Sequence, residues 1–128
     1  MSVPADLTNQ GPEAAFAAHL AQGRFMIQRS ASTGAHVFYP RPFVPGTGET
    51  DLEWVEASGD GTVHATTVNR RSPDKGGSFN VALIDLAEGP RMLARVVGIQ
   101  PEEVKIGMRV RARIEHLNGA PAVVWEPA

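Results

Sequence analysis

The stretch RVRARIEH, residues 109–116, decides the fold class because its side chains alternate between apolar and charged. Successive side chains of a β-strand point to opposite faces of the sheet. Val110 and Ile114 therefore share a face that packs on a core, while the arginines between them face solvent or a partner. The arginines of this strand, which we expect to bind a partner, are Arg109, Arg111 and Arg113.

Segments of similar character lie on either side of this strand and are separated by turn residues. Between the fourth and fifth of them, Pro101 is placed to begin a single helical turn. Five or six short strands with one helical interruption favour a small closed barrel of the OB type, with a β-sandwich as the alternative. The predicted strands cover residues 53–57, 61–71, 79–86, 91–97, 108–116 and 121–125.

A short helix is predicted ahead of the strands, over residues 12–22. Pro12 suits a first helical turn, and Gly23 suits a helix end. Phe16 and Leu20 form its one narrow apolar stripe. Because so short a helix is marginal in water, we expect this stripe to dock on a partner surface.

The amino-acid composition and the charge balance exclude several classes of function. The chain has 128 residues, a net charge of −2, 42% hydrophobic residues and no cysteine, which excludes disulfides and thiolate nucleophiles. Residues 61–128 carry nine basic and seven acidic side chains, far from the balance of a general nucleic-acid binder. No secretory signal is visible at the N-terminus, so a cytoplasmic location is expected.

Four motifs in a fixed order carry a resemblance to a known family. They are YPRP at 39–42, DLEWVEASGDGTV at 51–63, ALIDLAEGPRML at 82–93 and IGMRVR at 106–111. Over about residues 12–126 the chain resembles the acyl-CoA-associated OB-fold family with a rubredoxin-like zinc ribbon, which was catalogued as a domain of unknown function. The resemblance implies a tail and helix at 1–27, a ribbon at 28–52 and a barrel at 53–128.

The ribbon of this family carries two CxxC turns, and this chain departs from that pattern. A structural zinc site needs four sulfur or nitrogen ligands. We therefore expect no bound zinc, and a degenerate ribbon that is held instead by prolines and by packed aromatic side chains. The positions that match the four ligands are Ser30, Thr33, Val44 and Thr47.

The residues themselves show no catalytic set, because they include no cysteine nucleophile and no phosphate-binding loop. The resemblance implies a non-catalytic accessory subunit of a thiolase-like aldolase or acyltransferase that handles acyl-CoA thioesters. Whether the chain itself contacts acyl-CoA is left open, as is a homodimer. Two other functions stay as alternatives, namely an OB-fold module for single-stranded nucleic acid and a stand-alone acyl-CoA-binding protein.

Candidate binding residues follow from the chemistry of coenzyme A, whose phosphates need positive charge and whose pantetheine arm needs an apolar groove. The alternative for these residues is an ordinary solvated strand face. The connector at residues 35–43 separates the two turns of the predicted ribbon. Three of its residues, Tyr39, Arg41 and Phe43, belong to the expected partner surface. The candidate ligand-binding residues are Arg70, Arg71, Lys75, Phe79, Arg91 and Arg95.

Overall fold

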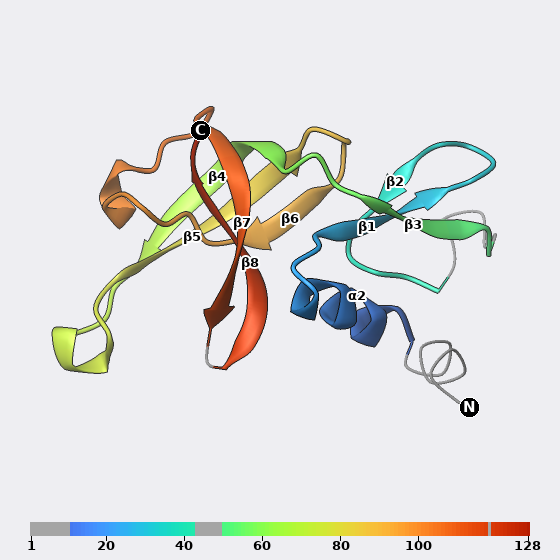
Figure 1. The fold of residues 1–128 in the computed structure, drawn as a ribbon. Coiled ribbons are helices and arrows are strands. Elements are labelled where there is room, and N and C mark those ends of the chain that lie inside the picture. Colours follow the sequence, from blue (N-terminus) through green and yellow to red (C-terminus); the bar gives the residue numbers. More distant parts are fainter. Residues whose placement is uncertain (1–10, 43–49, 118) are drawn as a thin grey trace. The chain divides into compact units, whose positions relative to one another are not determined.

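The computed structural model describes residues 11–42, 50–117 and 119–128 (Figure 1). These residues form two compact units, of which the first runs to Ala57 and includes His116–Ala122, while the second comprises Ser58–Glu115 and Val123–Ala128. No helix within the described ranges is long and apolar enough to cross a membrane. The elements are α2 (Gly11–Ala21), β1 (Met26–Ser30), β2 (His36–Val37), β3 (Leu52–Glu56), β4 (Asp60–Asn69), η1 (Pro73–Lys75), β5 (Phe79–Leu86), β6 (Arg91–Ala94), η2 (Pro101–Glu103), β7 (Arg109–Leu117) and β8 (Ala120–Pro127).

The first unit contains a three-stranded antiparallel sheet in the order β2-β1-β3, with β1 in the middle (Figure 1). Met26, Ile27 and Gln28 of this central strand are all buried. A strand buried on both faces shows no alternation of apolar and polar residues, which is why the sequence did not predict β1. The two-residue strand β2 was also not predicted.

Helix α2 lies against this sheet, and the predicted helix at 12–22 is confirmed. Leu20 is 5% exposed, and the His19 ring lies 5.2 Å from the ring of Trp54 on β3. Phe16 meets Phe38 edge to face, with ring centroids 5.4 Å apart. The apolar stripe of this short helix is therefore used, at least in part, for packing within its own unit.

The second unit contains a five-stranded sheet in the order β6-β5-β4-β7-β8. Burial alternates strictly along β5, where Ala82, Ile84 and Leu86 point into the core. Strand β7 alternates in the same way from Arg109 to Ile114, with Val110 1% exposed between two exposed arginines. The helical turn predicted at Pro101 is present as η2.

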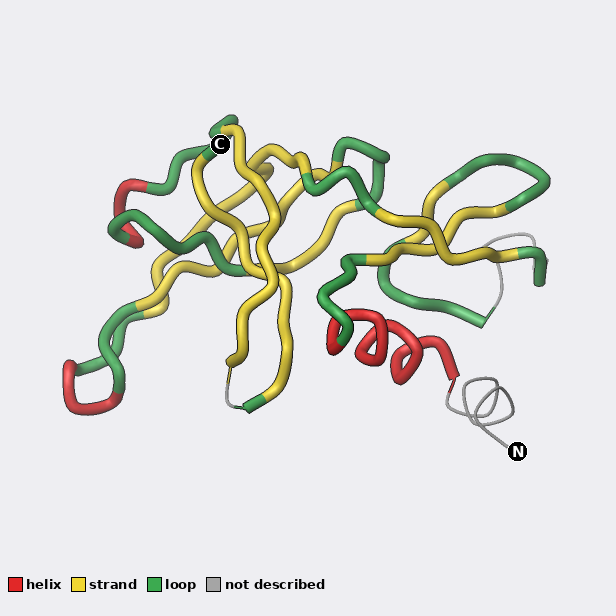
Figure 2. Tube along the Cα trace, viewed as in Figure 1, coloured by secondary structure: helices red, strands yellow, loops and turns green. Residues whose placement is uncertain are grey.

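This sheet curls and closes on itself (Figure 2). Val96 bridges Trp125 of β8 in parallel, the Val97 N–H donates to the Trp125 carbonyl at 2.7 Å, and the Trp125 N–H donates to the Arg95 carbonyl at 2.9 Å. Strand β6 therefore ends at Ala94 rather than at residue 97, because the chain leaves β5 there to meet β8. The predicted closed β-barrel is confirmed, and the β-sandwich alternative is wrong.

A buried asparagine secures this closure. Asn80 is 1% exposed, and its side-chain amide donates to the Thr66 hydroxyl at 2.7 Å and to the Thr67 carbonyl at 3.3 Å. Its side-chain oxygen accepts the Val96 N–H at 3.1 Å. Because a buried polar group is tolerated when its hydrogen bonds are made, Asn80 can join β4, β5 and the closing segment inside the core.

Candidate functional site

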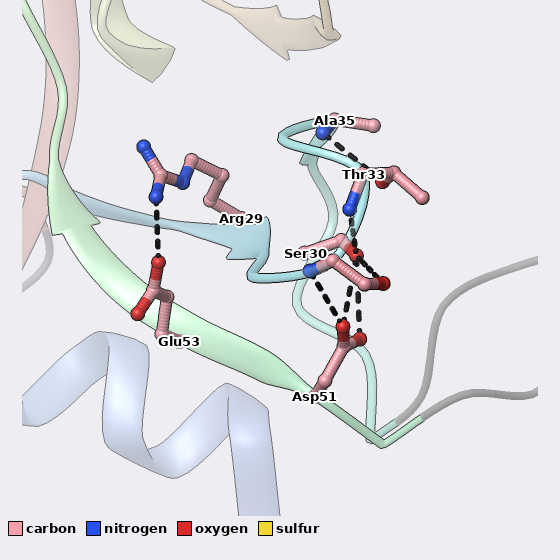
Figure 3. A network of polar contacts seen from close by, with 7 residues as sticks. Arg29, Ser30, Thr33, Ala35, Asp51 and Glu53 are labelled. Carbon is pink, nitrogen blue, oxygen red and sulfur yellow. Dashed lines mark hydrogen bonds and ion pairs between the residues drawn. The ribbon is translucent and has the colours of Figure 1, made fainter.

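The first turn of the predicted ribbon, residues 30–34, is closed by hydrogen bonds from its own backbone and hydroxyls (Figure 3). The Gly34 N–H donates to the Ser30 carbonyl at 2.8 Å, and the Thr33 N–H donates to the Ser30 hydroxyl at 3.3 Å. The Ser30 N–H donates to the Ala35 carbonyl at 2.8 Å. Ser30 is fully buried, so its hydroxyl must find partners inside the turn.

Asp51, which directly precedes β3, supplies the second half of this network (Figure 3). Its carboxylate accepts the Ser32 N–H at 2.8 Å and the Ser30 hydroxyl at 3.2 Å. The Ala31 N–H donates to the Asp51 carbonyl at 3.1 Å. Hydrogen bonds from Ser32, its hydroxyl first and its N–H second, hold the pKa of Asp51 below the ordinary 3.8, with a smaller contribution from Ser30.

The first turn does not fit a zinc ion. Ser30 and Thr33 match two ligand positions of the resembled family, but a hydroxyl engaged with a carboxylate and an amide is not a zinc ligand. No group of three or more histidine, aspartate or glutamate side chains in the described residues could hold a metal ion. Val44 and Thr47 lie outside the described residues, so the metal-free ribbon stays a prediction.

A buried glutamine orders the connector that follows. The Gln28 side-chain amide donates to the Arg41 carbonyl at 2.7 Å, and its oxygen accepts the Arg41 N–H at 2.6 Å. This pair of bonds imitates the pairing of a strand, although Arg41 lies in no strand. The ring of Tyr39, which is 49% exposed, lies 4.7 Å from the ring of Phe38.

A cleft of 640 Å³ lies between α2, β1, β3 and the connector. His19 lies on its wall, where burial first, and the charge of Arg24 second, lower the pKa of the imidazole. Apolar walls with a few polar groups are typical of ligand sites. The principal lining residues are Ala18, His19, Gln28, Arg41, Leu52 and Trp54.

The structure brings together three of the six candidate ligand-binding residues. The guanidinium carbon of Arg71 lies 4.5 Å from the centre of the Phe79 ring, and that of Arg95 lies 4.4 Å from the same centre. Arg71 is also fixed by its own loop, because its Nε donates to the Gly77 carbonyl at 3.2 Å. We call Arg71, Phe79 and Arg95 the arginine–phenylalanine cluster.

The other three candidates, Arg70, Lys75 and Arg91, are not part of this cluster. Arg70 pairs with Glu102 at 3.4 Å, and Lys75 is an exposed residue at the end of η1. Arg91 donates to Asp85 at 2.6 Å across the β5–β6 pair. Hydrogen bonding and charge from Arg91, with a smaller contribution from His64, lower the pKa of Asp85.

Some of the side chains expected to bind a partner are exposed to solvent, and others are buried or half-buried. Tyr39 and Arg41 are exposed, Phe16 is half-buried and Leu20 is buried, while Phe43 lies outside the described residues. Arg109 and Arg111 are exposed and form no ion pair with the described residues. Arg113 differs, because it pairs with Glu126 at 2.8 Å and contacts Glu115.

Sequence reasoning missed Asp51 and Gln28. For Gln28 a signal was available, because one amide side chain inside the apolar run FMIQ is a candidate for a buried hydrogen-bonding group. For Asp51 no local signal existed, since its partners lie about twenty residues earlier in the chain.

Comparison with known proteins places this architecture in a family. The family model of the ChsH2 C-terminal OB-fold domain matches residues 54–115. A DUF35 domain-containing scaffold protein of Pyrococcus furiosus is 33% identical over 95 residues, which are 72% of this chain and 70% of that protein. A probable enoyl-CoA hydratase alpha subunit of Thermomonospora curvata is 37% identical over 91 residues, 70% of this chain but only 28% of that protein.

A solved structure matches nearly the whole chain. A chain of the Ltp2-ChsH2(DUF35) aldolase superposes with a TM-score of 0.79 and 31% sequence identity, covering 91% of this chain and 94% of that one. The match includes the first unit as well as the barrel, since it covers more residues than the barrel contains. The chain therefore belongs to the DUF35 family of OB-fold proteins.

Proposed function

We propose that this chain is a non-catalytic accessory subunit that scaffolds an enzyme acting on acyl-CoA thioesters. The observation that carries the proposal is the likeness to the DUF35 chain of the Ltp2-ChsH2(DUF35) aldolase over 94% of that chain. The names of two relatives, a scaffold protein and a probable enoyl-CoA hydratase alpha subunit, support the same class of role.

The polar groups of the described residues also support a non-catalytic role. The Ser30 hydroxyl donates to Asp51, but neither residue has a hydrogen-bonded histidine among the described residues. His64 lies 3.3 Å from Asp85, but that carboxylate binds Arg91 and no hydroxyl in the same ranges. A nucleophile, base and acid in one hydrogen-bonded series are the usual basis of acyl transfer, and neither group completes such a series.

The catalytic residues would then belong to the partner, which we propose to be thiolase-like. A thiolase-like enzyme uses its own catalytic cysteine. The accessory chain, which has no cysteine, would therefore not need one. The chain would contribute a docking surface and would act in the compartment of its partner, which we propose to be the cytoplasm.

Affinity purification of the tagged full chain from its native host tests this function. We expect one thiolase-like protein to co-purify in near-equal amount, and the purified pair to act on an acyl-CoA thioester. Deleting the gene for this chain should lower that activity in host extracts. An activity that is the same without the chain, or recovery of nucleic acid in place of an enzyme, would contradict the proposal.

A further inference from the structure

We propose that the arginine–phenylalanine cluster binds the phosphorylated nucleotide end of coenzyme A. The cluster is built by three segments of the second unit, namely the loop after β4, the start of β5 and the residues after β6. The two guanidinium carbons lie over one ring and are no farther apart than the sum of their distances to its centre, 4.5 Å and 4.4 Å. One aromatic ring therefore holds two like charges within the sum of those two distances of each other.

The charges of this cluster are not neutralised by the described part of the chain. Elsewhere in that part, Arg29, Arg70 and Arg91 each pair with a carboxylate. Arg71 and Arg95 form no such pair within the described ranges, although like charges held over one ring repel each other. An external anion would relieve this repulsion, and charged hydrogen bonds from guanidinium to phosphate are strong, so a phosphorylated ligand is the partner that we propose.

The position of Arg71 is fixed before any ligand binds. Its Nε donates to the Gly77 carbonyl, which leaves the two terminal amino groups for an acceptor. Gly76 has φ +100°, and a Cβ built on it would lie 3.1 Å from Nη2 of Arg71, so the loop backbone passes close to the guanidinium. A positioned guanidinium loses less conformational freedom on binding than a mobile one.

The chemistry favours a small phosphorylated ligand over a nucleic acid. Single-strand binding by OB folds depends on several open aromatic rings, on which successive bases stack. Here two guanidiniums already lie over the single Phe79 ring, and the chain has a net charge of −2. Coenzyme A carries a 3′-phosphate and a diphosphate on one nucleotide, which two guanidiniums can bond separately. The choice of coenzyme A among phosphorylated ligands rests on the proposed function.

Isothermal titration calorimetry of the full chain with adenosine 3′,5′-bisphosphate tests the site. We expect saturable binding that weakens with added salt. Arg71→Gln and Arg95→Gln should each weaken binding about tenfold, and the double variant about a hundredfold, because each removes charged hydrogen bonds to phosphate. Arg111→Gln, an exposed arginine on β7, is the matched control and should bind like the unmodified chain. Thermal melts of all variants verify that they fold.

The absence of saturable binding of the bisphosphate would overturn the proposal. Equal binding by the double variant, or tighter binding of a single-stranded oligonucleotide than of the bisphosphate, would do the same. Inorganic phosphate that binds as tightly as the bisphosphate would also overturn it, since the nucleotide would then contribute nothing. Co-purification of the thiolase-like partner with the double variant separates the two proposals, because the scaffold role stands if the partner is retained while the binding site fails.

Discussion

The carboxylate of Asp51 orders a turn for which the sequence alone did not identify the stabilising side chain. It joins the turn at residues 30–34 to the start of β3 through Ser30 and Ser32, which lie about twenty residues earlier. A carboxylate that accepts N–H and hydroxyl hydrogen bonds is stabilised in its charged form. The turn is therefore held by an ionised side chain, which the sequence did not predict, in addition to the expected aromatic packing of Phe38 on Phe16.

We predict that Asp51→Asn lowers the melting temperature at pH 7. The folded-state pKa of Asp51 is depressed below 3.8, so its contribution to stability is present above 3.8 and is lost as the pH falls through the folded-state pKa. The difference in melting temperature between the chain and the variant should thus shrink in strong acid. Circular dichroism melts between pH 7 and pH 2 measure this difference.

The control for this experiment is Asp74→Asn, which removes an exposed carboxylate of η1. It has no hydrogen bond or ion pair among the described residues, so its melting temperature should follow that of the unmodified chain. A difference for Asp51→Asn that stays constant from neutral to acid pH would show that the charge of Asp51 does not stabilise the turn.

At the scale of elements, the strands with one buried face were predictable and the others were not. β5 alternates strictly and β7 alternates from Arg109 to Ile114, and their predicted ends agree with the structure within a residue. β1 is buried along nearly its whole length and shows no period of two, so it was missed. The end of β6 was misplaced because Val96 pairs with Trp125, a contact that no local pattern encodes.

The candidate site was predictable in composition but not in geometry. The sequence identified Arg70, Arg71 and Lys75 because they lie in and beside one loop, and Arg91 and Arg95 because they alternate on a neighbouring predicted strand. Which of them meet depends on pairings across the barrel, since Arg71 and Arg95 converge on Phe79 whereas Arg91 turns to Asp85. Local spacing contains no information on those pairings.

The packing of β4 against β5 and β8 yields a prediction for Gly61. A Cβ at this position would lie 2.7 Å from Cγ2 of Ile84 and 3.0 Å from Cζ3 of Trp125, both in the buried core. Gly61→Ala should therefore lower the free energy of unfolding by about 1–3 kcal/mol through overpacking. Urea denaturation measures this change.

Thr67→Ala on the same strand is the matched control, because Thr67 is exposed. Its free energy of unfolding should change by less than about 1 kcal/mol. Equal stability of Gly61→Ala and the unmodified chain would mean that β4 can shift away from Ile84 and Trp125 without cost.

At the scale of the whole molecule, charge is distributed unevenly between the two halves of the sequence. Residues 1–60 carry three basic and seven acidic side chains, while residues 61–128 carry nine and seven. Internal ion pairs neutralise part of the basic excess, as Arg113 does with Glu126. Arg109 and Arg111 remain exposed on one face of β7 and are available to an acidic partner surface.

We predict that the double variant Arg109→Gln, Arg111→Gln binds the co-purified enzyme about tenfold more weakly, mainly through slower association. The effect should be larger at low salt, because exposed charges are screened as ionic strength rises. Surface plasmon resonance with the immobilised partner measures both rates. Lys105→Gln, a single exposed charge outside β7, is the control and should leave both rates unchanged. Unaltered rates for the double variant would remove β7 from the docking surface.

The turn at residues 30–34 is held by oxygen and nitrogen groups and not by sulfur. Ser30, Ser32 and Asp51 hold this turn with hydroxyl, amide and carboxylate groups. Thiolates at the same place would be open to attack by peroxide, which oxidises sulfur stepwise to acids that no longer bind a metal. Serine and aspartate have no such chemistry. Peroxide that would oxidise the cysteines of a zinc-binding turn should therefore leave the hydrogen bonds of this turn intact.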